Sequence, residues 1–165
     1  MIWVSIIAAL VLFFSIIGGL KEGAVKQFFT LLATLIAIPI AGVSYQVLAG
    51  WLSFIPGQNW ENFIAFFVMM AVVSILLYFV FIIPGRMFKK SWDVGVSFAV
   101  LGAVFSLFNA AIGIVVFALV LNAYPIIDWL ARAMSGSGVI VWLVSQMSFI
   151  QAVLPEVLRQ AAAMV

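Results

Sequence analysis

The apolar residues of the chain fall into four long runs, separated by short segments that hold most of the charges. The runs cover about residues 2–20, 27–51, 62–83 and 94–122. A helix needs about 20 apolar residues to cross the hydrocarbon core of a bilayer, which is about 30 Å thick. Because a helix also satisfies its own backbone hydrogen bonds in lipid, the pattern predicts an all-α integral membrane protein with four transmembrane helices.

Proline positions and run lengths refine this prediction. Pro39 lies near the middle of the second run and predicts a kink, because proline removes a backbone donor and clashes with the preceding turn. Pro84 and Gly85 are expected to end the third helix. The fourth run is longer than a perpendicular span needs, so its helix must tilt or project from the membrane at one end. The four helices form a predicted transmembrane domain over residues 1–124.

Residues 125–165 are predicted to form a helical C-terminal tail. Residues 126–134 are typical of a short interfacial helix, and the sequence Ser-Gly-Ser-Gly at 135–138 indicates a flexible hinge. The next run, 139–154, is apolar but short, and its polar residues do not gather on one helical face. We expect a surface-lying or bundle-packed helix there in preference to a fifth span, followed by a last short helix from Pro155 onward.

The basic residues predict the orientation. Of the seven Lys and Arg residues, five lie in the loops at 21–26 and 85–93, and none lies in the loop at 52–61. Loops rich in Lys and Arg stay in the cytoplasm. Both basic loops are therefore predicted to be cytoplasmic, and the N- and C-termini are predicted to lie outside.

Composition narrows the function classes. The chain is 68% hydrophobic and 7% charged, whereas a soluble domain has roughly 45–50% apolar and about 25% charged residues. This excludes an ordinary soluble enzyme and a nucleic-acid-binding module. The chain has no Cys and no His, so thiolate and imidazole groups supply neither catalysis nor metal ligands.

No ionisable Asp, Glu, Lys or Arg lies inside the four runs, which argues against proton-coupled transport. We expect a protein that is not an enzyme and that binds no metal or cofactor.

Small and polar residues single out the fourth run as a central, closely packed helix. Two stripes recur at four-residue spacing: Gly95, Ala99 and Ala103, and Gly102, Ser106 and Ala110. Such stripes let helices approach closely, within one chain or between chains. Asn109 lies near the middle of this run, where an Asn most often forms a hydrogen bond between helices; the alternative is a residue that lines a pore or binds a substrate.

The connection between the first two runs is rich in glycine and charge, with the sequence GGLKEGAVKQ at 18–27. A glycine turn with a positively charged anchor explains it structurally, and a docking surface for a partner or an anionic lipid is the functional alternative. This arrangement resembles the colicin V production protein family of bacterial inner-membrane proteins. In that family the first span ends in Gly, followed by a basic residue, Gly, and a basic residue beside Gln or Glu. The residues that fit are Gly19, Lys21, Gly23, Lys26 and Gln27.

A second part of the resemblance lies in the fourth run. The family has an Asp-Arg pair before Leu-Gly and then glycines at four-residue steps; this chain has the Leu-Gly at residues 101–102. Ser97 and Phe98 stand where the charged pair is expected, and Ser106 and Ala110 stand where glycines are expected. Two alternatives follow: the function of the charged pair is absent here, or Asp93, a few residues upstream, substitutes for it.

The resemblance implies a multi-pass protein of the bacterial inner membrane that is linked to toxin production or export and to envelope maintenance. It supplies no catalytic residue, so we expect action through membrane-protein partners or a homo-oligomer within the lipid bilayer, without nucleic acid. Two other hypotheses compete: a small accessory subunit of a larger respiratory or photosynthetic membrane complex, and a channel or carrier assembled as an oligomer.

Overall fold

The computed structural model describes residues 2–54, 56–92 and 95–154, and this part of the chain consists of helices and short connections. The elements are α1 (Ile2–Glu22), α2 (Ala24–Trp51), α3 (Gln58–Trp92), α4 (Val96–Ala123), α5 (Asp128–Ser135), α6 (Gly138–Gln146) and α7 (Ser148–Val153). Four segments are long and apolar enough to cross a membrane: α1, α2, residues 59–84 of α3, and α4. The predicted all-α architecture with four transmembrane helices is confirmed.

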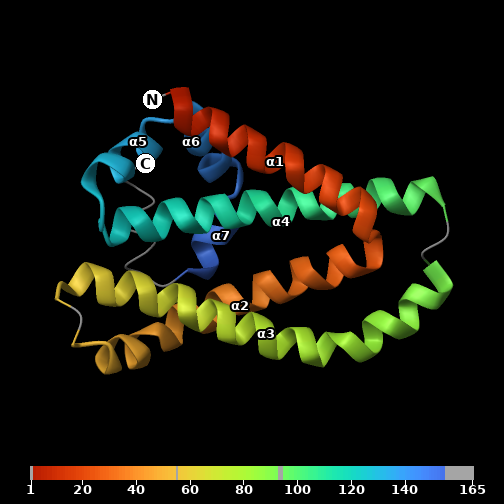
Figure 1. Ribbon diagram of the computed structural model, residues 1–165, viewed down its shortest axis with the longest axis horizontal. Helices are drawn as coiled ribbons and strands as arrows, with labels where there is room; N and C mark the ends of the chain where they lie inside the picture. The colour runs from red at the N-terminus through yellow and green to blue at the C-terminus, as the bar shows by residue number, and fades with distance from the viewer. Residues whose placement is uncertain (1, 55, 93–94, 155–165) are drawn as a thin grey trace.

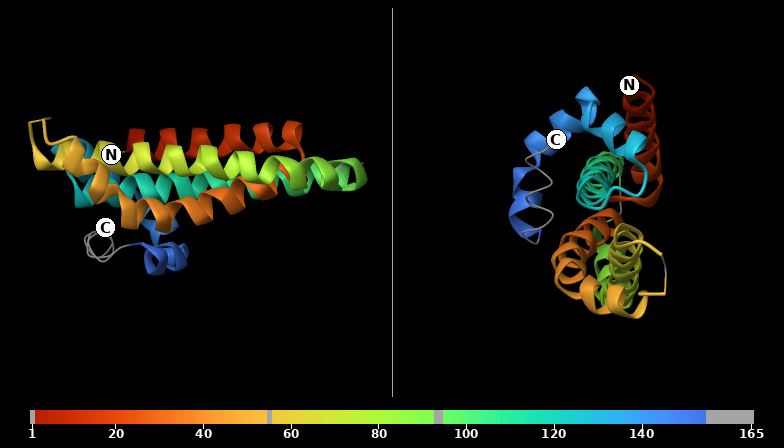
Figure 2. Two further views of the ribbon diagram at one scale, coloured as in Figure 1. Left: turned by 90° about the horizontal axis from the view of Figure 1, so that it is seen from below. Right: turned by 90° about the vertical axis from the view of Figure 1, so that its left-hand side faces the viewer.

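The four long helices form two packed pairs (Figure 1, Figure 2). α1 packs along α4, α3 packs along α2, and α2 joins the pairs by packing against α4. Of the α4 spanning segment 50% is buried, against 17% for α1 and 11% for α3. α4 is therefore the central helix of the described structure, and α1 and α3 lie on the outer surface of that structure.

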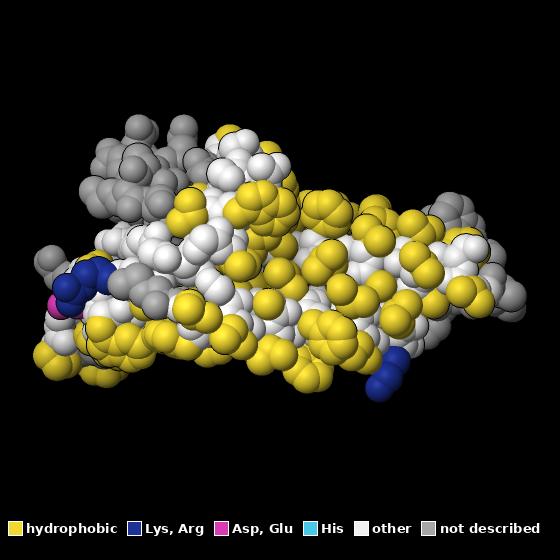
Figure 3. All heavy atoms as spheres, turned by 90° about the horizontal axis from the view of Figure 1, so that it is seen from above, with side chains coloured by type: hydrophobic (Ala, Val, Ile, Leu, Met, Phe, Trp, Pro, Cys, Tyr) yellow, Lys and Arg dark blue, Asp and Glu magenta, His cyan; other side chains and the backbone are white. Residues whose placement is uncertain are grey.

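The outer faces of α1 and α3 are apolar. Phe13 and Phe14 on α1, and Leu76, Phe79 and Ile83 on α3, are exposed. Figure 3 shows hydrophobic side chains spread along the length of one face, with Lys, Arg, Asp and Glu of the described residues coloured at only two places on it. Such a surface is unsuited to water and fits the hydrocarbon core of a bilayer.

The short helices pack against the long ones. Met134 of α5, Ile140 and Leu143 of α6, and Ile150 of α7 are buried in the same hydrophobic core as α2 and α4. Figure 2 shows α5 to α7 curving along one side of the long helices. The tail within the described residues is thus fixed by apolar burial.

The segment between α5 and α6 differs from the prediction. Ser137 is 1% exposed, and its Oγ lies 2.8 Å from Oγ of Ser5 on α1 in a hydrogen bond. On the neighbouring α5, the ring of Trp129 lies 5.6 Å from that of Trp3. The connection at 135–138, predicted to be a flexible hinge, is therefore packed against α1 at Ser137.

The apolar run at 139–154 also differs from a single helix, because it breaks at Met147 into α6 and α7. Neither helix is long enough to cross a membrane. The last helix predicted from Pro155 onward lies outside the described residues, as does Asp93.

Three predicted helix boundaries differ from the structure by three residues or more. The second helix begins at Ala24, three residues before its predicted start, and the third begins at Gln58, four residues before its own. The third helix does not end at Pro84 and Gly85 but continues to Trp92. A proline removes only one backbone donor, and a helix of a membrane protein tolerates it where local adjustment satisfies the freed carbonyl. All three basic residues predicted to lie in a loop at 85–93, at positions 86, 89 and 90, therefore belong to α3.

Candidate functional site

The first two spanning helices meet at a single residue, Gly23. α1 ends at Glu22 and α2 begins at Ala24. Gly23 has φ 82° and ψ 163°, a backbone conformation that only glycine adopts at low cost. Its N–H donates to the carbonyl oxygen of Gly19 at 3.1 Å, and its own carbonyl accepts from the N–H of Gln27 at 3.3 Å. Hydrogen bonds into both helices therefore fix this corner.

Beside the corner, α1 and α4 touch through their backbones. A Cβ atom added to Gly102 would lie 2.5 Å from the carbonyl oxygen of Gly19 and 2.7 Å from the carbonyl carbon of Gly23. A Cβ atom added to Gly19 would collide with the Gly102 carbonyl oxygen and lie 2.6 Å from Cβ of Ser106. Real Cβ atoms essentially never come within 3.0 Å of such neighbours. The small residues on this face of α4 thus permit contact with α1 and with the corner itself.

A polar cluster of Glu22, Lys26 and Gln27 surrounds the corner. One carboxylate oxygen of Glu22 accepts from Nζ of Lys26 at 2.7 Å, and the other accepts from Nε2 of Gln27 at 2.6 Å. Gln27 is buried, whereas the side chains of Lys26 and Glu22 are 52% and 41% exposed. Glu22 is the last residue of α1, and its carboxylate reaches past Gly23 to two side chains in the first turn of α2. The cluster therefore joins the end of α1 to the first turn of α2.

The charged side chains at the corner do not balance, and a net positive charge remains. Lys21 is exposed and has no ion-pair partner within the part of the chain that the structure describes. Glu22 neutralises one of the two lysines, so Lys21, Glu22 and Lys26 together carry a net charge of about +1. The corner consequently offers a positive, hydrogen-bonding surface at the end of two apolar helices.

Comparison with known proteins identifies the family of the chain. The family model described as colicin V production protein matches residues 4–148, which is most of the chain. The chain belongs to the colicin V production protein family. No curated protein and no solved structure matches it. The matched region includes α5, α6 and the first residue of α7 as well as the four spans.

The two separate parts of the colicin V production pattern meet in the fold. Gly19, Lys21 and Gly23 come from the α1–α2 corner, and Gly102 and Ser106 come from α4, about eighty residues later in the sequence. In the sequence these residues form two separate candidate stretches. In the structure Gly102 contacts Gly19 and Gly23, and Ser106 contacts Gly19. Ser106 is buried there, whereas Ser97, at the position expected for the charged pair, is exposed near the start of α4.

Asn109 does not join this site. Its Oδ1 is buried and has no hydrogen-bond partner among the described residues. The expected bond between helices is therefore not formed within that part of the chain. An unpaired amide oxygen in an apolar setting costs free energy, so a partner for Asn109 would have to come from outside the described residues.

Sequence reasoning missed two features of this colicin V production family member. Glu22 was not a candidate, although its spacing of four residues from Lys26 is a readable signal for a helical ion pair. At the other end of the spans, the hydroxyls of Tyr45 and Tyr124 lie 2.6 Å apart in a hydrogen bond. Burial, and then the bond to Tyr45, raise the pKa of the Tyr124 hydroxyl. No local pattern links residues so far apart in sequence.

The side chains at the corner are suited to binding another molecule. Its groups are an ammonium, a carboxylate and an amide, and each of them already holds a neighbour in place. The described residues contain no group of three or more potential metal ligands. A rigid, partly exposed polar cluster of this kind is suited to docking a charged or hydrogen-bonding surface.

Proposed function

We propose that this member of the colicin V production family is a non-enzymatic protein of the bacterial inner membrane that acts in toxin production or export, or in envelope homeostasis, through partner proteins. The observation that carries the proposal is the corner: Gly23, Gly19 and Gly102 hold a polar cluster rigidly at the end of apolar helices. A merely connecting turn between two spans needs neither a backbone contact with a third helix nor a bonded Glu22.

The proposed orientation places this corner in the cytoplasm and both termini outside. Lys21 and Lys26 lie at the end of the spans where α1 meets α2, and the basic residues at positions 86, 89 and 90 follow the apolar part of α3. The connection at 52–57 carries no Lys or Arg. The distribution favours retention of the corner on the cytoplasmic side, where soluble and membrane partners are both accessible.

Complementation of a deletion strain tests the proposal. Gly23→Val forces a β-branched residue into φ 82° and should distort the corner without inverting the protein. Gly57→Val is the matched control, because Gly57 also has positive φ, at 112°, but lies in the connection at the opposite end. At equal protein level we expect Gly23→Val to lose toxin secretion or detergent resistance and Gly57→Val to retain it. Full complementation by Gly23→Val would contradict the proposal, because it would show that the corner only connects α1 to α2.

A further inference from the structure

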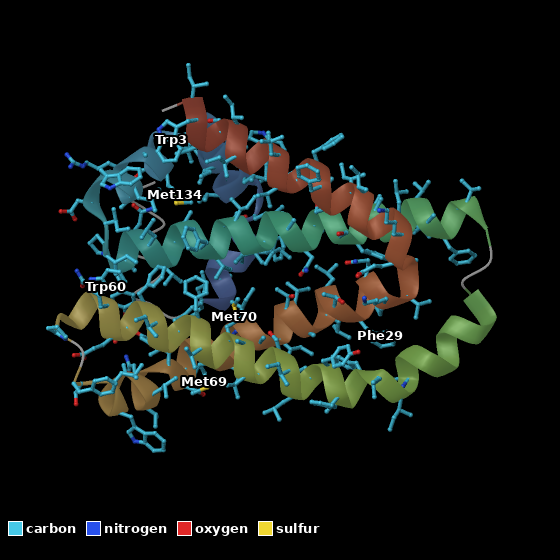
Figure 4. The ribbon with its side chains drawn as sticks, viewed as in Figure 1. Trp3, Phe29, Trp60, Met69, Met70 and Met134 are labelled. Carbon is cyan, nitrogen blue, oxygen red and sulfur yellow. The ribbon has the colours of Figure 1, made fainter. Side chains whose placement is uncertain are left out.

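A groove of about 340 Å³ lies between α2 and α3, next to the corner. Its apolar wall includes Phe29, Phe81 and Ile82. The rings of Phe29 and Phe81 lie 5.5 Å apart, and Figure 4 shows Phe29 between the two helices. This wall suits a hydrocarbon chain, as the bilayer location of both helices requires.

The other lining side chains form a polar track that enters the apolar part of the helices. On α2, Lys26, Thr30 and Thr34 recur every four residues; on α3, Ser74 and Tyr78 do the same. Residues four apart lie on one helical face, so both helices contribute hydroxyl groups to the same groove. From Lys26 to Thr34 the track spans eight residues, or about 12 Å along the axis.

Several polar groups in the track remain available to a ligand. Ser74 and Tyr78 make no hydrogen bond within the described residues. Thr30 and Thr34 donate to carbonyl oxygens of their own helix, so their oxygens still accept. Lys26 carries three N–H donors and uses one of them on Glu22. Unpaired hydroxyl donors are unfavourable in hydrocarbon, and a ligand with acceptor oxygens would satisfy them.

The chemistry of these groups matches one class of amphiphile. Lys26 lies in the first turn of α2, Phe29 and Phe81 come next along the groove, and the hydroxyls of Thr34 and Ser74 lie deepest. An anionic glycerophospholipid offers a phosphate to the cation, ester oxygens to the hydroxyls and acyl chains to the aromatic wall. The ammonium of Lys26, which lines the groove, favours an anionic headgroup over a zwitterionic one. We propose that the α2–α3 groove binds one anionic phospholipid, with its phosphate at Lys26 and its ester region at Ser74 and Tyr78.

The test is a lipid titration of the purified full-length protein in detergent, with bound lipid counted by native mass spectrometry. The probes are phosphatidylglycerol, phosphatidylethanolamine and phosphatidylcholine of identical chains. We expect phosphatidylglycerol to bind at least fivefold more tightly than either of the others. Lys26→Gln should weaken phosphatidylglycerol about fivefold, which corresponds to about 1 kcal/mol for one basic residue near an anionic surface.

Two further variants separate the groove from surface charge. Lys21→Gln removes the same charge at the same corner but does not line the groove, so it should change the affinity less than twofold. Ser74→Ala changes no charge and should weaken binding at least twofold. Gel filtration checks folding, and if Lys26→Gln aggregates, the Ser74→Ala result alone decides. Equal effects of the two lysine variants, equal binding of all three lipids, or an unchanged Ser74→Ala would overturn the proposal.

A protein occupant of the groove is a further outcome that would overturn it. The chain has no Cys, so Thr34→Cys introduces a single reporter into the groove. With lipid bound there, the thiol should remain monomeric under mild oxidation in phosphatidylglycerol vesicles. A disulfide-linked dimer formed in high yield would show that a second copy of the chain occupies the groove.

Discussion

Replacing Gly102 with a larger residue should lower the stability of the fold, whereas the same substitution at Gly113 should not. Both glycines lie inside α4, so the gain in helix propensity from Gly to Ala, about 1 kcal/mol, is common to both variants. They differ in their surroundings: a Cβ atom on Gly113 meets nothing within 4 Å, while one on Gly102 meets three backbone atoms at 2.5 to 3.0 Å. The difference between the variants therefore isolates the helix contact.

The size of the effect follows from those distances. Carbon atoms pack favourably at about 3.5–4.0 Å, so the nearest neighbour of a Gly102 methyl group must retreat by about 1 Å. That neighbour is the carbonyl oxygen of Gly19, which has no rotamer to adopt and moves only with α1. Inserting a methyl group into such a contact costs about 1–3 kcal/mol, and Gly102→Leu should cost more.

Thermal unfolding in a mild detergent, followed by gel filtration of the surviving fraction, measures this difference. For a chain of this size, 1 kcal/mol shifts the midpoint by about 2–4 °C. We expect Gly102→Ala to melt at least 2 °C below Gly113→Ala, and Gly102→Leu to give little folded protein while Gly113→Leu folds normally. Equal midpoints for the two alanine variants would refute the backbone contact between α1 and α4.

Three other predictions concern stability and topology. Tyr124→Phe should lower stability by about 1–2 kcal/mol in the same assay, because it leaves the buried Tyr45 hydroxyl unpaired, and the double variant Tyr45→Phe/Tyr124→Phe should recover much of the loss; additive losses would contradict the pair. Asn109→Leu should leave the melting midpoint unchanged or raise it, since its Oδ1 has no partner among the described residues; a loss above about 2 kcal/mol would reveal a partner elsewhere. In intact cells an impermeant thiol reagent should label Ser53→Cys but not Ser91→Cys; the reverse pattern would invert the proposed orientation.

The sequence predicts the spans well because a membrane imposes a simple length and polarity rule. Hydropathy runs locate all four spanning segments. Their ends are harder to predict, since the boundary of an apolar run marks the membrane and not the helix. α3 thus continues beyond Pro84 to Trp92, and α1 and α2 are separated by Gly23 alone.

The sequence predicts one of the two surfaces that meet at the candidate site. Four-residue spacing identifies the small face of α4 at Gly102 and Ser106, because a helical period defines a face. It does not identify the surface that this face meets, which proves to be Gly19 and the corner. The groove beside Thr34 and Ser74 depends likewise on how α2 and α3 pair, and pairing is a property of the whole fold.

The central claim is that the α1–α2 corner is a recognition surface for a partner protein. Its most direct test places a photo-cross-linking amino acid at Lys21, which is exposed, and another at Ile75 on the exposed apolar face of α3, in living cells of the native host. The account predicts a discrete protein adduct at position 21 that disappears in a Gly23→Val background and is absent at position 75. No protein adduct at position 21, or the same adducts at both positions, would contradict it.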